Sequence, residues 1–60
     1  MKNNDEVIFR NPGEAFQDAI DSGRLTRDAE KENYAGHYMY MGTYQGKDQF
    51  KHSMTRGYLR

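Results

Sequence analysis

The spacing of apolar positions changes along the chain and predicts where strands and helix lie. Val7, Ile8 and Phe9 form a short β-prone run, and the Asn-Pro-Gly sequence at 11–13 is a strong turn signal. We therefore predict a first strand over residues 5–10.

The signals for a helix start and a helix stop follow directly. Asn11 can cap a helix whose first residue is Pro12, and Glu14 stands where a capping box places its acid. Gly23 suits a left-handed stop. Together these residues predict a helix over 12–22.

One narrow apolar stripe predicts the buried side of this helix, and it comprises Ala15, Phe16, Ala19 and Ile20. Phe16 and Ile20 are its largest members and are expected to anchor the helix. Residues 24–33 are strongly polar and predict a connector, from which Leu25 is expected to reach back to the core.

A β-hairpin is predicted over residues 36–54, because aromatic, imidazole and thioether side chains succeed one another as on a pleated ribbon. We expect a three-residue turn with Gly46 left-handed in a G1 bulge and Thr43 opposite Lys47. The alternative is a two-residue type I′ turn, which we disfavour because it forces Gln45 to positive φ.

The three-residue turn fixes which side chains share a face. It pairs Tyr40 with Phe50 and Tyr38 with His52 on one face, and Met41 with Gln49 and Met39 with Lys51 on the other. A slip by one residue would instead place Phe50 and His52 beside the methionines. We prefer the first register, which gives an apolar face of Tyr38, Tyr40, Phe50 and Met54.

The predicted fold is a single small α+β domain over residues 1–60, with β-α-β-β order and one helix packed on an antiparallel hairpin-based sheet. Residues 55–60 are predicted to form a tail.

Composition excludes several classes of protein. The 60 residues include no cysteine, which excludes disulfides and thiolate zinc sites, and a chain this short has little room for a deep substrate cleft. No apolar window spans a bilayer, and the first residues lack a secretory pattern. We expect a soluble cytoplasmic protein that does not contact membranes.

Charge is uneven although nine basic and nine acidic residues cancel. Residues 1–30 carry four basic and seven acidic side chains, whereas residues 47–60 carry four basic side chains and one acidic. Two interpretations remain open. The two ends attract each other within the fold or across a dimer, or the basic end binds a polyanion.

Catalytic and metal chemistry find no support in the sequence. His37 and His52 are expected to point to opposite faces and so to share no metal. Ser22 and Ser53 lack a nucleophile motif. We predict a non-enzyme with no catalytic residues, cofactor, metal or small-molecule substrate.

Protein binding is the predicted function, because no second layer is available to cover Met39 and Met41. We expect a small adaptor, inhibitor or regulator, of the kind that phages and mobile elements encode, which binds a protein partner or forms a homodimer. The predicted partner-binding residues are Met39, Met41, Tyr44, Lys51, Arg56 and Tyr58. The competing possibility is that the tail folds over the methionines.

Nucleic-acid binding is the alternative function, because aromatic and basic residues interleave along the last third of the chain. These residues are Tyr40, Tyr44, Lys47, Lys51, His52, Arg56, Tyr58 and Arg60. The zero net charge and the lack of an RNP-like motif count against it.

Overall fold

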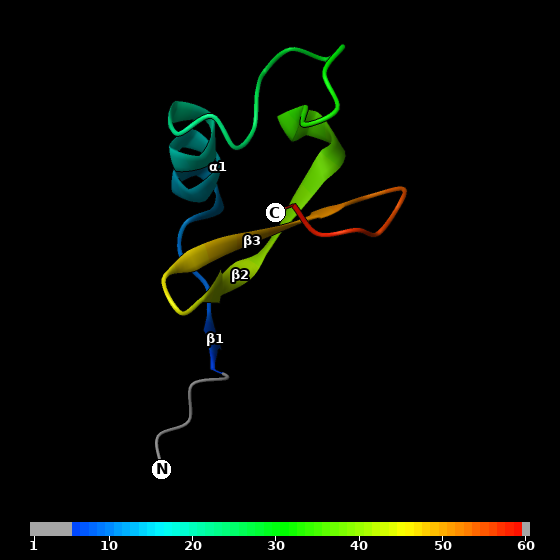
Figure 1. Cartoon of the computed structure of the whole chain (residues 1–60). Coiled ribbons are helices and arrows are strands. Elements are labelled where there is room, and N and C mark those ends of the chain that lie inside the picture. The colour runs from blue at the N-terminus through cyan, green and yellow to red at the C-terminus, as the bar shows by residue number, and fades with distance from the viewer. Residues whose placement is uncertain (1–5, 60) are drawn as a thin grey trace.

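The computed structural model describes residues 6–59 and contains one α-helix beside a three-stranded antiparallel sheet of order β1-β2-β3. The elements are β1 (Val7–Ile8), α1 (Pro12–Asp21), the short 3-10 helix η1 (Ala35–His37), β2 (Tyr38–Tyr44) and β3 (Lys47–His52). Figure 1 shows α1 on one side of the hairpin formed by β2 and β3. The predicted α+β fold with β-α-β-β order is confirmed.

Strand β1 is shorter than the strand predicted over 5–10, and residue 5 lies outside the described residues. It pairs antiparallel with β2, with Val7 opposite Tyr44 and Ile8 opposite Thr43. The pairing is brief because the helix begins only four residues after β1 ends, at Pro12.

Both ends of α1 are fixed by the residues that the sequence singled out. The Asn11 side chain accepts a hydrogen bond from the Glu14 backbone N–H at 3.2 Å. At the other end Gly23 adopts φ 86°, and the Arg24 N–H reaches back to the Ala19 carbonyl at 2.9 Å. This is the Schellman arrangement, which satisfies the last carbonyls of the helix.

The hairpin turn differs from the prediction. Tyr44 pairs directly with Lys47, and both Gln45 (φ 52°) and Gly46 (φ 81°) are left-handed, as in a type I′ turn. The predicted three-residue turn is therefore wrong. The primed turn matches the right-handed twist of the two strands, and this match outweighs the cost of positive φ at one non-glycine residue.

A β-bulge between Tyr40 and Thr43 restores the predicted register further along the hairpin. The bulge places one extra residue in β2, which offsets the shorter turn. The pairs Tyr40 with Phe50, Met39 with Lys51 and Tyr38 with His52 are consequently confirmed.

The core lies between α1 and the hairpin. Its fully buried members are Ala15, Ala19, Leu25 and Phe50, and the partly buried side chains packed on them are Phe16, Ile20, Ala35, Tyr38, Tyr40 and Leu59. The Phe16 and Phe50 rings lie 4.9 Å apart, as the predicted anchoring of the helix requires.

Met54 does not belong to this core, although the hairpin pattern placed it on the packed face. It is 78% exposed. The reason is that β3 ends at His52 and the chain then turns, so strand alternation no longer applies at position 54.

The segment 57–59 pairs with the outer edge of β3 and so widens the sheet. Tyr58 forms an antiparallel bridge with Lys51, and the Leu59 N–H donates to the Phe50 carbonyl at 2.8 Å. In Figure 1 this segment runs next to β3 and carries Leu59 to the core. The second edge of the sheet is thereby partly closed.

Candidate interaction face

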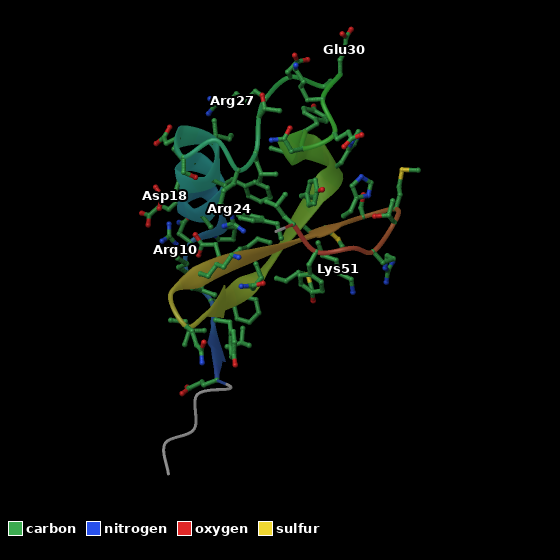
Figure 2. All side chains as sticks on the ribbon, in the orientation of Figure 1. Arg10, Asp18, Arg24, Arg27, Glu30 and Lys51 are labelled. Carbon is green, nitrogen blue, oxygen red and sulfur yellow. The ribbon has the colours of Figure 1, made fainter. Side chains whose placement is uncertain are left out.

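The sheet has one face packed on α1 and another that α1 does not cover, which we call the open face. Phe50 points to the core, so its neighbours Gln49 and Lys51 point the other way. Directly opposed residues share a face. By this alternation the open face consists of Val7, Met39, Met41, Tyr44, Lys47, Gln49, Lys51 and Tyr58. Figure 2 shows Lys51 on the side of β3 away from α1.

One row across the open face joins three of the predicted partner-binding residues. Met39 is opposite Lys51 in the hairpin, and Lys51 is in turn bridged to Tyr58. The Lys51 ammonium lies 5.6 Å from the centre of the Tyr58 ring, within cation–π range. Met39 remains 40% exposed and Tyr58 54% exposed. The segment that carries Tyr58 thus lies beside β3 and leaves Met39 accessible.

The other predicted partner-binding residues are placed less uniformly. Met41 and Tyr44 lie on the open face and are half-buried. Arg56 lies off this face, in the turn that follows β3, where it is exposed and has a left-handed φ of 67°. Val7 was missed by sequence reasoning, because the partner of a two-residue strand cannot be inferred from its own pattern.

The open face is cationic although the whole chain is neutral. Lys47 and Lys51 are its charged residues, and no carboxylate occupies the positions assigned to it in the described chain. Asp48 alternates to the helix side, where its Oδ1 accepts a hydrogen bond from the Thr43 hydroxyl at 2.6 Å. The open face therefore carries a positive charge among the described residues.

A chain of hydrogen bonds explains why Tyr40 is held on the other side of the sheet. The backbone N–H of Arg10 donates to the Tyr40 hydroxyl at 3.0 Å, and Thr43 donates its only hydroxyl proton to the Asp48 carboxylate. In the 2.6 Å contact between Tyr40 and Thr43, Tyr40 must consequently be the donor. The Arg10 side chain completes the ring, with its Nε 3.7 Å from Asp48 Oδ1, and its hydrogen bond with Asp18 raises the pKa of Arg10 above its usual value.

The basic and aromatic residues of the nucleic-acid alternative are divided between the two faces. Tyr40 and His52 lie on the helix side, and Arg60 lies outside the described residues. The members on the open face are Tyr44, Lys47, Lys51 and Tyr58. The stacking surface that the sequence suggested is accordingly smaller than the pattern implied.

The two histidines lie close together, contrary to the expectation of opposite faces. Their ring centres are 5.6 Å apart, although the Ser53 N–H bonds to the His37 carbonyl as the predicted pairing requires. The reason is that His37 belongs to η1, where side chains do not alternate as they do in a strand.

His52 is fixed in a tautomer that does not suit a metal. Its Nδ1 accepts hydrogen bonds from the backbone N–H groups of Met54 and Thr55, each at 3.1 Å. In the neutral ring the proton is consequently on Nε2, so neither nitrogen offers a free lone pair. Among residues 6–59 no three His, Cys, Asp or Glu side chains are grouped to hold a metal ion.

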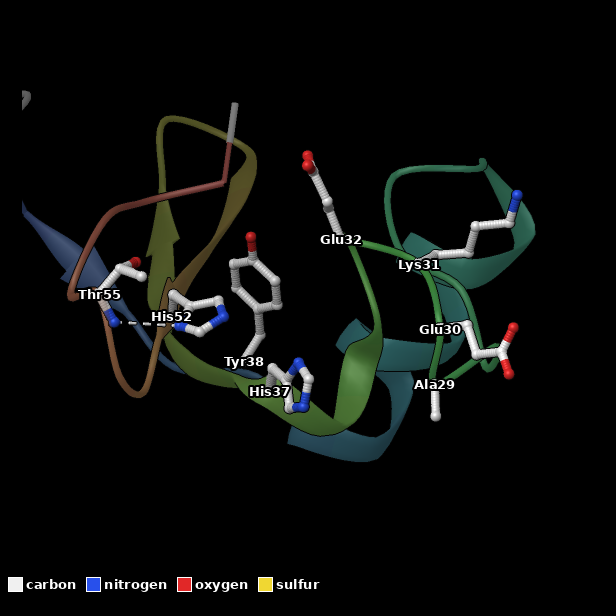
Figure 3. Close-up of a pocket in the computed structure, with 8 residues that line it drawn as sticks. All are labelled: Ala29, Glu30, Lys31, Glu32, His37, Tyr38, His52 and Thr55. Atoms are coloured by element: carbon white, nitrogen blue, oxygen red, sulfur yellow. Dashed lines mark hydrogen bonds between the residues drawn. The ribbon is translucent and has the colours of Figure 1, made fainter.

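An open hollow of about 470 Å³ lies beside these histidines, and Figure 3 shows Glu32 across it from Tyr38 and His52. Its lining residues are Ala29, Glu30, Lys31, Glu32, His37, Tyr38, His52 and Thr55. The dashed bond in Figure 3 joins His52 to the Thr55 backbone, so this ring serves to hold the turn after β3.

Comparison with known proteins adds no family to this description: no family model, curated protein or solved structure matches the chain. Within the part of the chain that the structure describes, the helix is too short and too polar to cross a membrane.

Proposed function

We propose that this protein is a non-enzymatic protein-binding module, an adaptor, inhibitor or regulator in the cytoplasm, that binds its partner over the open face. The observation that carries the proposal is the accessible row of Met39, Lys51 and Tyr58, which no described segment covers. A thioether, an aromatic ring and the aliphatic part of a lysine form an adaptable apolar contact surface.

The charge of the open face favours a partner segment that is both apolar and acidic. Lys47 and Lys51 attract carboxylates and orient the partner, while Met39 supplies the contact area that is buried. Self-association through this same face would set the lysines of two copies against one another. The open face is therefore assigned to a different protein.

A partner captured from the host through the open face should be lost when that face is altered. We expect Met39→Lys or Lys51→Glu to weaken binding by about 2 kcal/mol, roughly 30-fold, as truncation of a central contact residue does. Binding of the purified partner by calorimetry measures the change. Met54→Lys is the matched control, because Met54 is 78% exposed and off the face.

Two outcomes would contradict the proposal. The first is a captured protein whose affinity changes in neither open-face variant. The second is nuclease-sensitive capture together with salt-dependent binding to a single-stranded oligonucleotide that Lys51→Glu abolishes, which would favour the nucleic-acid alternative.

Arg56 provides a separate test of how far the interface extends beyond the open face. It is a predicted partner-binding residue that lies off this face, two residues before Tyr58, and its left-handed φ of 67° stores strain. Arg56→Gly should raise the free energy of unfolding by about 1 kcal/mol and weaken partner binding. Arg56→Ala removes the same guanidinium and keeps the strain, so it should weaken binding without stabilising the fold. Urea unfolding measures the stability of each variant. Unchanged partner affinity in both variants would exclude Arg56 from the interface.

A further inference from the structure

Among residues 6–59, the outer edge of β1 has no partner strand, and it adjoins the open face at Val7. The order β1-β2-β3 places β1 at one side of the sheet, and the segment 57–59 lies at the other. Figure 1 shows β1 at the end of the molecule remote from α1. The side chains there are exposed to an unusual degree for their apolar character: Val7 by 46%, Ile8 by 58% and Phe9 by 72%. Such an edge is a template for another strand.

The backbone of β1 presents its free groups at two positions. The Ile8 carbonyl is directed at β2, where it lies 3.2 Å from the position that a Cβ on Gly42 would occupy. Backbone groups of successive residues in a strand point to opposite sides. Val7 precedes Ile8, so its N–H and C=O groups point outward, away from β2. Phe9 follows the end of β1, but the backbone N–H of Arg10 donates to the Tyr40 hydroxyl of β2 at 3.0 Å. The alternation therefore continues, and the groups of Phe9 also point outward.

The sequence of this edge is complementary to itself. In an antiparallel pair centred on Ile8, Val7 of one copy lies opposite Phe9 of the other, and Glu6 lies opposite Arg10. Val7 and Phe9 are the residues with outward groups, so they form two hydrogen-bonded pairs about the twofold axis.

The charges in this register are opposite at both ends. Glu6 is exposed, and Arg10 uses Nη2 for Asp18 while its Nε faces Asp48. The Arg10 side chain is 36% exposed. Its guanidinium has five N–H donors, so it can donate hydrogen bonds to a further carboxylate. Exposed pairs of this kind contribute little affinity, but they select the register.

We propose that two copies of this chain associate through β1, with Ile8 meeting Ile8 at the twofold axis, to form one continuous six-stranded antiparallel sheet. The twofold axis is perpendicular to the sheet, so both helices lie on one side and both open faces on the other. The contact is small, below the roughly 1,200 Å² of stable complexes, and the dimer is accordingly weak and concentration-dependent. This inference is independent of the partner proposed for the open face.

Sedimentation equilibrium over a wide range of protein concentration tests the dimer. The wild-type mass should rise from one chain toward two, whereas Ile8→Lys should stay at one chain because it opposes two ammonium groups at the twofold axis. Glu6→Lys replaces two weak attractions per dimer with two repulsions against Arg10, so it should weaken association about tenfold. Met54→Lys adds the same charge at an exposed position away from this edge and should dimerise like the wild type.

A backbone variant separates strand pairing from side-chain contact. Val7→Pro removes an outward N–H and leaves the bonds of Ile8 to β2, so it should abolish the dimer, while Val7→Ala should weaken it less. Circular dichroism verifies that each variant is folded. A wild-type mass of one chain at the highest concentration, or a dimer that survives Ile8→Lys and Glu6→Lys, overturns the proposal. So does a dimer disrupted by Met39→Lys alone, which would place the second copy on the open face.

Discussion

Replacing Phe50 with alanine should leave most of the protein unfolded at room temperature. Phe50 is fully buried, and its ring lies 4.9 Å from the ring of Phe16 and 5.5 Å from the Arg24 guanidinium. Phe→Ala in a core costs about 3–5 kcal/mol. Since a core in a chain this short supplies rarely more than about 3–5 kcal/mol in total, the loss is comparable with the whole stability.

Urea unfolding followed by far-UV circular dichroism measures this effect. Phe50→Leu keeps most of the buried volume and should retain a cooperative transition at a lower urea midpoint. Met54→Ala should unfold like the wild type because Met54 is largely exposed. A cooperative Phe50→Ala variant that loses less than about 1 kcal/mol would show that Phe50 is not central to the core.

A methyl group at position 42 should detach β1 from the sheet. Gly42 has φ 102°, and a Cβ there would lie 2.5 Å from Val7 Cγ1 and 3.1 Å from the Phe9 ring. The Val7 side chain is β-branched and stiff, so relief requires a shift of the β1 backbone. We expect Gly42→Ala to lower the free energy of unfolding by about 2–5 kcal/mol, the sum of backbone strain and overpacking.

Gly46→Ala is the matched control for this prediction. Gly46 also has positive φ, 81°, but nothing lies within 4 Å of a Cβ built there, so its substitution adds strain alone, about 1–2 kcal/mol. Hydrogen exchange should show faster exchange of the Ile8 amide in Gly42→Ala than in Gly46→Ala. If the two variants lost equal stability and their Ile8 amides exchanged at equal rates, the close approach of β1 to Gly42 would contribute nothing to the effect of Gly42→Ala.

The helix could be predicted almost to the residue because its signals are local. Asn11, Pro12 and Gly23 act within one turn of the chain that they begin or end. The hairpin turn could not be predicted with equal success. Its type depends on the twist of two strands. Its length was offset by a bulge whose mark in the sequence is the single glycine Gly42, with φ 102°, and one glycine suggests a bulge without fixing the register.

The predicted positions of the Met54 and His37 side chains were wrong because strand alternation was extended past the ends of the strands. Met54 follows the end of β3 and His37 precedes β2, so neither obeys the period of two. On the open face, alternation within β2 and β3 sufficed for Met39 and Lys51. It could not place Tyr58, whose bridge to Lys51 is a pairing that neither residue's local sequence indicates.

The bulge in β2 and the short turn of the hairpin have a joint consequence for how this sequence can diverge. Insertion of one residue in the turn would shift the pairing of β2 with β3 by one residue. Deletion of the extra residue of the bulge would shift the pairing back beyond the bulge. The two changes are deleterious singly and compatible together, so the pairing of Tyr40 with Phe50 would be inherited unchanged. Descendants of such a chain would differ in loop length while keeping the same interior.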